Sequence, residues 1–142
     1  DYVSQLMANC PLRDEADISA AFANFINHKA EAQISCFQFG WMNPWWAVKL
    51  DAQKRPEYLF PEARATRSQD LPPLYCPTGA IWIAKSSVLK EEKTFYAKNC
   101  IFHPMDWMSA MDIDDTGDLE MAKALFLDKE KRASKANADG TE

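Results

Sequence analysis

The sequence is poor in glycine and has no clustered basic segment. Its four glycines, Gly40, Gly79, Gly117 and Gly140, are isolated from one another, so no Gly-rich loop is present that would cradle phosphates with backbone amides. The formal net charge is −5, and without a Lys/Arg-rich segment a general affinity for a polyanion is not expected. These absences argue against nucleic acid as a partner and leave the sequence without a recognisable triphosphate-binding loop.

Metal-binding cysteine motifs and long apolar runs are also absent from the sequence. The four cysteines are scattered without a Cys-x-x-Cys pair, and only His28 and His103 could complete a site, so zinc is not expected. No apolar run approaches the roughly 18 to 20 residues that span a bilayer, and the start of the chain lacks a signal-peptide pattern. We expect no membrane association and a cytoplasmic location.

The remaining composition is that of one globular domain. The 142 residues are 47% hydrophobic and 26% charged, which suits a single substantial core. Residues 3–7 and 32–39 predict strands, and between them Asp14, with Asp17 at the third position, predicts the start of a helix. A strand-helix-strand unit predicts a parallel, right-handed crossover. The predicted fold class is therefore α/β, a partial Rossmann-like, mostly parallel sheet flanked by helices.

Residues 41–78 interrupt this pattern with a proline- and tryptophan-rich excursion. The segment contains Pro44, Pro56, Pro61, Pro72, Pro73 and Pro77 together with Trp41, Trp45 and Trp46. Long regular elements are excluded there, although two short strands in a hairpin-like arrangement are compatible with the pattern. The aromatic side chains would cover the core, line a ligand pocket or form a dimer interface.

The C-terminal part predicts two more strands and two helices. Strands are expected over residues 80–84 and 99–102, a short helix over 86–90 and the last helix over 116–129. Residues 131–142 are polar and lack large apolar side chains, so a disordered tail is expected. The predicted organisation is one domain over residues 1–130, with the excursion inside it, followed by the tail.

Asp112 and Asp114 are the most informative residues for function. If residues 111–114 form a strand, the two carboxylates point to the same face, roughly 6.5 to 7 Å apart. Mg²⁺ prefers oxygen ligands and is usually held by one or two carboxylates together with substrate phosphate, so the pair predicts a magnesium-nucleotide site. Asp115 has a simpler interpretation, as the cap of the next helix with Asp118 in a capping-box relation.

Three blocks of sequence follow one another along the chain. They are Cys10-Pro11-Leu12-Arg13 followed by Asp17-Ile18, residues 67–72 leading into 77–83, and Asp112-Ile113-Asp114 followed by Asp118-Leu119-Glu120. Together they resemble the acylneuraminate cytidylyltransferases, which are the CMP-sialic acid synthetases and their relatives for legionaminic and pseudaminic acids. The resemblance runs from about residue 1 to residue 126.

The resemblance implies a CTP-dependent transfer of CMP to a nine-carbon 2-keto sugar acid, with release of pyrophosphate. It implies that Asp112 and Asp114 are catalytic residues that hold Mg²⁺, and that the excursion forms a homodimer and helps to shape the sugar pocket. Arg67 would pair with the sugar carboxylate through two parallel hydrogen bonds, unless it is simply solvated. Gln69 would bind sugar hydroxyls.

Four further candidate substrate-binding residues stand where this chain departs from the family pattern. Asn9 lies where the family usually has Gln-Pro-Thr-Ser, Thr78 and Gly79 lie where it has Arg-Pro-Asn-Gly, and Lys49 lies three residues after the position of its sugar-pocket lysine. Because Gly79 has no side chain, it would allow a ligand or another backbone segment to come close. Alternatively, it would only form part of a turn after Pro77. The N-terminal phosphate-binding loop of the family is missing from the sequence, so we expect a truncated, C-terminal portion that does not transfer CMP alone.

Two alternatives stay open at this level. A non-catalytic, dimeric sugar-acid binding module would keep the aromatic excursion and residues 67–79 while lacking the nucleotide half. A glycosyltransferase fragment would also use Asp-x-Asp to hold a sugar nucleotide through a cation, although the helix directly after Asp114 fits the cytidylyltransferase pattern better.

Overall fold

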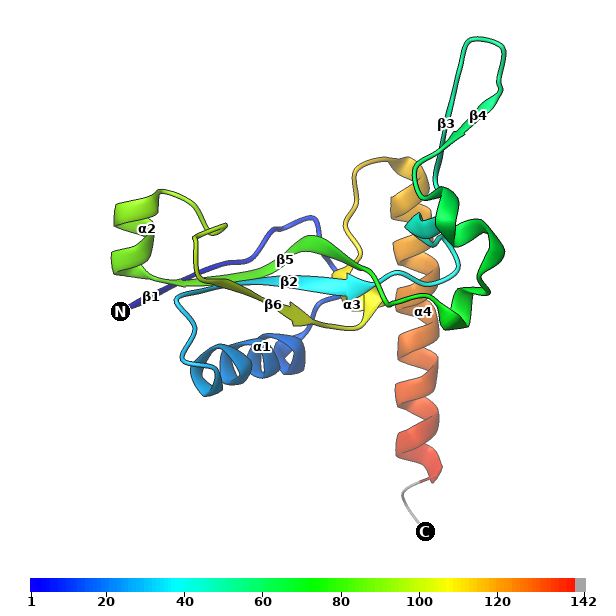
Figure 1. Cartoon of the computed structure of the whole chain (residues 1–142). Helices are drawn as coiled ribbons and strands as arrows, with labels where there is room; N and C mark the ends of the chain where they lie inside the picture. Colours follow the sequence, from blue (N-terminus) through cyan, green and yellow to red (C-terminus); the bar gives the residue numbers. More distant parts are fainter. Residues whose placement is uncertain (140–142) are drawn as a thin grey trace. The chain divides into compact units, whose positions relative to one another are not determined.

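The computed structural model describes residues 1–139, and its elements are drawn in Figure 1. The chain divides into two compact units. The first unit is formed by Asp1–Phe37 and Pro77–Glu142, and the second by Gln38–Cys76. The second unit therefore lies close to the bounds of the excursion that the sequence predicts over residues 41–78.

The first unit contains a four-stranded sheet with the strand order β1-β5-β2-β6. The strands are β1 (Tyr2–Gln5), β2 (Ala32–Gln38), β5 (Tyr75–Lys85) and β6 (Cys100–Pro104). β1 pairs antiparallel with β5, and β2 pairs in parallel with β6. Between β5 and β2, the backbone bonds from Lys85 N to Glu31 O and from Phe39 N to Leu74 O follow an antiparallel course. The fold is thus mixed α/β, and most of its strand pairings are antiparallel.

This strand order corrects the expectation of a mostly parallel sheet. β1 and β2 run in the same direction and are joined through a helix, as the sequence predicts, but β5 lies between them. β5 follows the second unit, which leaves the sheet at the end of β2 and re-enters it at the start of β5. A chain that leaves and re-enters a sheet at the same end forms an antiparallel neighbour. The predicted α/β class is confirmed, and the arrangement is broadly compatible with part of a Rossmann-like fold.

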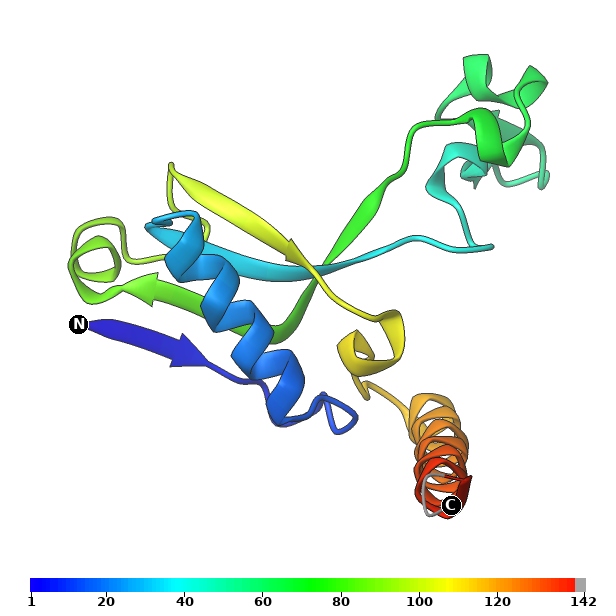
Figure 2. The same cartoon turned by 90° about the horizontal axis from the view of Figure 1, so that it is seen from below.

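Helix α1 (Glu15–Asn27) covers one face of this sheet, as Figure 2 shows. Asp14 and Asp17 form the predicted capping box at its start. Phe25 is buried in the core between the helix and the sheet, whereas Phe22 on the same helix is exposed. The predicted cap is confirmed.

Two buried polar residues of β2 fix the neighbouring elements. The Gln33 side-chain amide donates to Ala21 O at 2.8 Å. The Ser35 hydroxyl donates to Thr78 O at 3.1 Å and accepts from Ile81 N at 2.9 Å. A buried polar group is costly unless it is hydrogen-bonded. The two bonds of Ser35 therefore favour one register of β5 against β2, and the Gln33 bond holds α1 against β2. That register sets where Thr78 and the residues after it lie.

The described part of the first unit also contains the helices α2 (Ser86–Glu92), α3 (Trp107–Ala110) and α4 (Thr116–Asp139). α4 continues through residues 131–139, where the sequence predicted a disordered tail. That stretch is rich in Ala, Lys and Arg, which favour helix, and Arg132 pairs with Asp128 one turn earlier at 2.7 Å. The end of the predicted tail, residues 140–142, lies outside the described residues. Over residues 1–139, no helix combines the length and the apolar character needed to cross a membrane.

The second unit is built from short elements. They are η1 (Pro44–Trp46), β3 (Val48–Leu50), β4 (Pro56–Tyr58), η2 (Pro61–Ala65) and η3 (Ser68–Asp70). β3 and β4 form an antiparallel hairpin, the arrangement that the sequence analysis found compatible with this segment. Lys49 lies opposite Glu57 in it. Trp45 packs edge-on against Phe60 with ring centroids 5.0 Å apart. In contrast, Trp41 is 86% exposed, so only part of the aromatic surface is used within the unit.

Candidate functional site

The candidate site is centred on residues 112–114, which connect α3 to α4 and are called the acidic connection below. The sequence predicted a short strand here, but the segment is irregular. Just before it, Thr78 donates its hydroxyl to Ala110 O at 2.8 Å. Within it, Ile113 N donates to Asn9 O at 2.9 Å. A strand needs a ladder of bonds with a neighbouring strand, whereas Ile113 bonds a loop carbonyl.

Asp115 and Asp118 cap α4. Asp115 Oδ1 accepts from Gly117 N at 2.7 Å and from Asp118 N at 3.0 Å. Asp118 Oδ2 accepts from Asp115 N at 3.2 Å and from Asp114 N at 3.0 Å. The predicted capping box is therefore confirmed. Both carboxylates are used by the backbone, so Asp112 and Asp114 carry the two carboxylates of this segment that are available to a ligand.

The carboxylates of Asp112 and Asp114 belong to exposed residues. Within residues 1–139, neither carboxylate forms an ion pair or a hydrogen bond with another side chain or with the backbone. This arrangement fits a hydrated Mg²⁺, which keeps several waters and is completed by substrate phosphate. In the described part of the chain, no group of three or more His, Cys, Asp or Glu could hold a metal. A cation here would therefore need oxygens from a substrate.

The β1–α1 loop, residues 6–14, lies against the acidic connection. Arg13 Nη1 donates to Ala80 O at 2.7 Å, which ties the loop to β5. Burial raises the pKa of the Cys10 thiol, the negative charge of Asp112 raises it further, and the positive charge of Arg13 opposes the change. Asp112 thus lies close enough to this loop for its charge to act on the thiol.

Thr78 and Gly79 lie near the start of β5 beside the same loop. The Thr78 hydroxyl is buried and is donated to Ala110 O, so it holds the start of the acidic connection. Gly79 O accepts from Met7 N at 3.3 Å, and a Cβ atom at Gly79 would collide with Met7 Sδ. The close neighbour of Gly79 is therefore a side chain of the loop. A substrate contact of Thr78 or Gly79 stays a prediction.

The other predicted substrate-binding residues belong to the second unit. Arg67 Nε lies 2.9 Å from Asp70 Oδ2 in an exposed ion pair. Lys49 is exposed on β3. Gln69 lines a pocket of about 380 Å³. The pocket is also lined by Gln38, Phe39, Gly40, Asn43 and residues 71–74. Its polar side chains are carboxamides, which suit a neutral, hydroxyl-bearing group.

The structure brings Asn9, Thr78, Asp112 and Asp114 together around the β1–α1 loop, although they are far apart in the sequence. Arg13 joins this group through its contact with β5, which no sequence pattern indicated. In the sequence analysis, Arg13 appears only as the last residue of the block Cys10-Pro11-Leu12-Arg13. The carbonyl that it binds is 67 residues away. Arginine next to a capped helix start is otherwise most simply interpreted as solvated.

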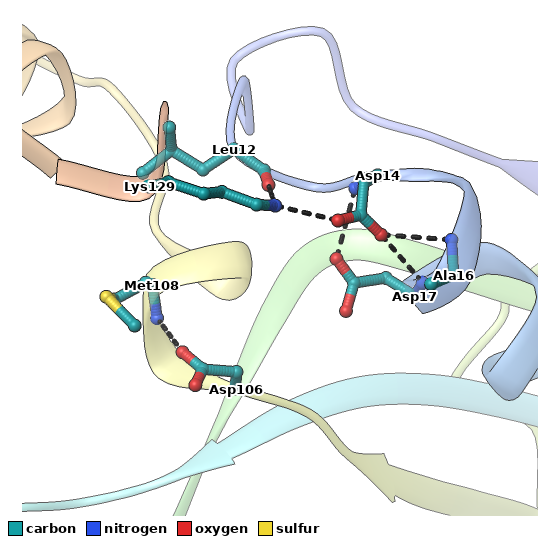
Figure 3. A network of polar contacts seen from close by, with 7 residues as sticks. All are labelled: Leu12, Asp14, Ala16, Asp17, Asp106, Met108 and Lys129. Carbon is teal, nitrogen blue, oxygen red and sulfur yellow. Dashed lines mark hydrogen bonds and ion pairs between the residues drawn. The ribbon is translucent and has the colours of Figure 1, made fainter. Parts of the chain in front are cut away.

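A second set of contacts attaches the β1–α1 loop to α4, as Figure 3 shows. Lys129 Nζ donates to Asp14 Oδ2 at 2.7 Å and to Leu12 O at 3.5 Å. The hydrogen bond between Lys129 and Asp14 is the main reason that the pKa of Asp14 is lowered and the pKa of Lys129 is raised. Lys129 and Asp14 are 115 residues apart, so no local pattern could have indicated this contact.

No family model matches this chain. Among curated proteins, it is similar to the post-translational flagellin modification protein B of Campylobacter coli, with 26% identity over 94% of this chain and 56% of the relative. It is similar to the pseudaminic acid cytidylyltransferase of Campylobacter jejuni, with 27% identity over 89% of this chain and 54% of the relative. The N-acylneuraminate cytidylyltransferase of Streptococcus agalactiae is 27% identical over 87% of this chain and 30% of the relative.

These homologues confirm the resemblance that the motif blocks indicate. Two of the three are named as cytidylyltransferases, one for pseudaminic acid and one for N-acylneuraminate. The chain spans about half the length, or less, of the curated relatives it matches. The homologues support a general interpretation as a nucleotidyltransferase.

Proposed function

We propose that this chain is part of a cytidylyltransferase that transfers CMP from CTP to a sialic-type sugar acid. The observation that supports this most is the exposed pair Asp112 and Asp114, held beside Asn9 in a chain with homologues that are named cytidylyltransferases. Because the sequence has no Gly-rich loop, the triphosphate would be gripped by protein outside these residues. The activity is therefore proposed for the whole gene product, and its cytoplasmic location stays a prediction.

The proposed reaction joins the anomeric oxygen of the sugar acid to the α-phosphorus of CTP. The new O–P bond forms while the bond from the α-phosphorus to the bridging oxygen of pyrophosphate breaks, and the sugar hydroxyl loses its proton to solvent. When bound, Mg²⁺ would neutralise charge on the phosphate oxygens. Asp112 and Asp114 would hold that cation. The acidic connection is held at Ala110 on one side and at the cap of α4 on the other. Asp112 and Asp114 would therefore orient the phosphates before the reaction.

The second unit is proposed to bind the sugar acid. Gln69 stands at a pocket whose carboxamides offer both donors and acceptors to hydroxyl groups. Arg67 would exchange its partner Asp70 for the carboxylate of the sugar acid. This exchange costs little, because an exposed ion pair contributes at most about 1 kcal/mol. Lys49, exposed on the hairpin, would supply a second positive charge.

A homodimer formed through the second unit is also part of the proposal. Trp41 is 86% exposed, Met42 is 67% exposed and Leu50 is 62% exposed. Large exposed apolar side chains on one small unit are typical of a protein interface. Sedimentation at micromolar concentration should show a dimer that Trp41→Ser with Met42→Ser converts to a monomer. A wild-type monomer would contradict this part of the proposal.

The activity is tested by pyrophosphate release from the full-length protein with CTP, Mg²⁺ and either pseudaminic acid or N-acetylneuraminic acid. Asp112→Asn and Asp114→Asn should each lower kcat/KM by about 100-fold or more, since changes to the surroundings of metal ligands alone cost about 10- to 100-fold. Asp115→Asn is the matched control. Asn also caps a helix, so this variant loses a neighbouring charge without losing the cap and should stay active.

Other outcomes separate the alternatives. Release of a nucleoside diphosphate from a nucleoside-diphosphate sugar supplied together with an acceptor, without release of pyrophosphate from CTP, would indicate a glycosyltransferase and would contradict the proposal. Binding of the sugar acid by the full-length protein without turnover of CTP would indicate the non-catalytic module. Equal activity of Asp112→Asn and Asp115→Asn would exclude Asp112 as a metal ligand.

A further inference from the structure

α4 and its preceding segment are attached to the β1–α1 loop at two places. At the acidic connection, Ile113 N bonds the loop at Asn9 O. Farther along the helix, Lys129 Nζ bonds the loop at Asp14 and at a backbone carbonyl. Loop, helix and acidic connection therefore form a closed ring that contains both candidate metal ligands.

The Lys129 contact joins groups of the loop that other contacts already hold. Asp14 is already fixed as the cap of α1, because its Oδ1 accepts from Ala16 N at 2.9 Å and from Asp17 N at 3.1 Å. Its other oxygen accepts from Lys129. Leu12, which supplies the second acceptor, is 7% exposed. Since both partners of Lys129 are held in place by other contacts, little freedom is lost on their side when the bonds form.

We propose that Lys129 is a positioning residue for the carboxylates of Asp112 and Asp114, acting through the β1–α1 loop. This inference rests on the proposed function, since it assigns Lys129 a part in holding that metal site. With Lys129 bound, separation of α4 from the loop is less favourable, and Asn9 O stays beside Ile113 N for more of the time. Without Lys129, one of the two attachments is lost, and the acidic connection samples more positions.

Hydrogen exchange of the Ile113 amide, followed by NMR, tests the inference without any ligand. Lys129→Met should speed this exchange roughly two- to fivefold, the scale of a partly exposed ion pair. The amide of Ile81 in the core should speed up by no more than the measured change in the global free energy of unfolding requires. Lys123→Met is the matched control, because Lys123 pairs with Glu120 at 2.8 Å within the same helix. It should leave the Ile113 amide unchanged.

Two more variants separate positioning from a general loss of stability. Asp14→Asn removes the charge but keeps an N-cap acceptor, and it should speed exchange at Ile113 by no more than Lys129→Met does, because Lys129 keeps its bond to Leu12 O. The double variant should be no faster than Lys129→Met, since that variant already removes both bonds of Lys129. Lys129→Arg keeps the positive charge and should restore slow exchange.

The second readout is the affinity for Mn²⁺ in the presence of CTP, measured with the full-length protein by paramagnetic relaxation of water. Lys129→Met should raise the Kd roughly two- to fivefold, and Lys123→Met should not. Wild-type exchange at Ile113 in Lys129→Met overturns the inference, whatever the Mn²⁺ affinity. Failure of the wild type to bind Mn²⁺, with the exchange effect present, would instead refute the proposed function and with it the metal-positioning role.

Discussion

The two units of this protein hold their charged side chains in different ways. In the second unit, ion pairs join residues three or four apart, as between Arg67 and Asp70. The first unit also has local pairs, as between Lys123 and Glu120. In addition it has long-range contacts, since Lys129 binds Asp14 across 115 residues and Arg13 binds β5 across 67 residues. A local pair needs only a turn of chain and can exchange its partner for a ligand. Long-range bonds fix a loop in one place, which is what the proposed cation site in the first unit would require.

Burial shows the same contrast. The first unit has a core in which α1 packs against the sheet. Among the described residues of the second unit, Ala63 is the only hydrophobic residue with a fully buried side chain. A unit with so little core depends on contacts at its surface. We therefore expect the second unit to be the less stable of the two and to respond more to bound partners.

The largest expected effect tests this contrast in stability. Phe25→Ala should lower the free energy of unfolding by about 3–5 kcal/mol, because the ring is 1% exposed in the core of the first unit. Phe22→Ala removes the same ring from a site that is 45% exposed on the same helix and should cost less than about 1 kcal/mol. Chemical denaturation measures both values. Equal losses would contradict the assignment of the core.

A glycine in each unit sharpens the comparison. Gly79→Ala should destabilise the first unit by about 1–3 kcal/mol, because the new Cβ overpacks against Met7. At Gly40 in the second unit, a Cβ atom would have nothing within 4 Å, and φ is not positive. Gly40→Ala should therefore be neutral or stabilising by up to about 1 kcal/mol. In denaturation experiments, Met7→Ala should reduce the cost of Gly79→Ala, and an unchanged cost would exclude the Met7 contact as its cause.

The long-range ion pair should give a pH-dependent contribution to stability. The folded pKa of Asp14 is lowered, so its contribution is present above the unfolded pKa of about 3.9 and is lost as the pH falls through the folded value. The folded pKa of Lys129 is raised, so its contribution is present below about pH 10.4 and is lost as the pH rises through the folded value.

The size of this contribution is limited by solvent. The side chains of Lys129 and Asp14 are 52% and 44% exposed, so after screening the pair contributes no more than about 1 kcal/mol. The difference in unfolding free energy between wild type and Asp14→Asn should be constant from about pH 5 to 9 and should shrink near pH 3. A difference that grows on acidification would contradict the ion pair.

The smallest effect on stability is expected at Arg67. Arg67→Met breaks an exposed pair with Asp70 and should change the free energy of unfolding by less than about 0.5 kcal/mol. Arg55→Met breaks a similar exposed pair with Asp51 and serves as the matched control. In calorimetric titration of the full-length protein, Arg67→Met should weaken binding of the sugar acid while Arg55→Met should not. Equal affinities would remove Arg67 from the proposed sugar site.

Local patterns were sufficient for the helix starts. Both capping boxes, Asp14 with Asp17 and Asp115 with Asp118, were predicted from their spacing and are present in the structure. A cap depends on four consecutive residues, so its signal is complete in the sequence. The acidic connection was wrongly predicted as a strand, because alternation alone does not show whether a neighbouring strand is available for pairing.

By itself, the sequence determined the α/β class and the caps of α1 and α4, because each depends on residue types at short spacing. Only the tertiary structure decided that β5 lies between β1 and β2, that Asn9 lies beside Ile113, and that α4 is attached to the β1–α1 loop. These arrangements join residues far apart in the chain. They form only when the core closes around α1, and no local pattern encodes which distant groups then meet.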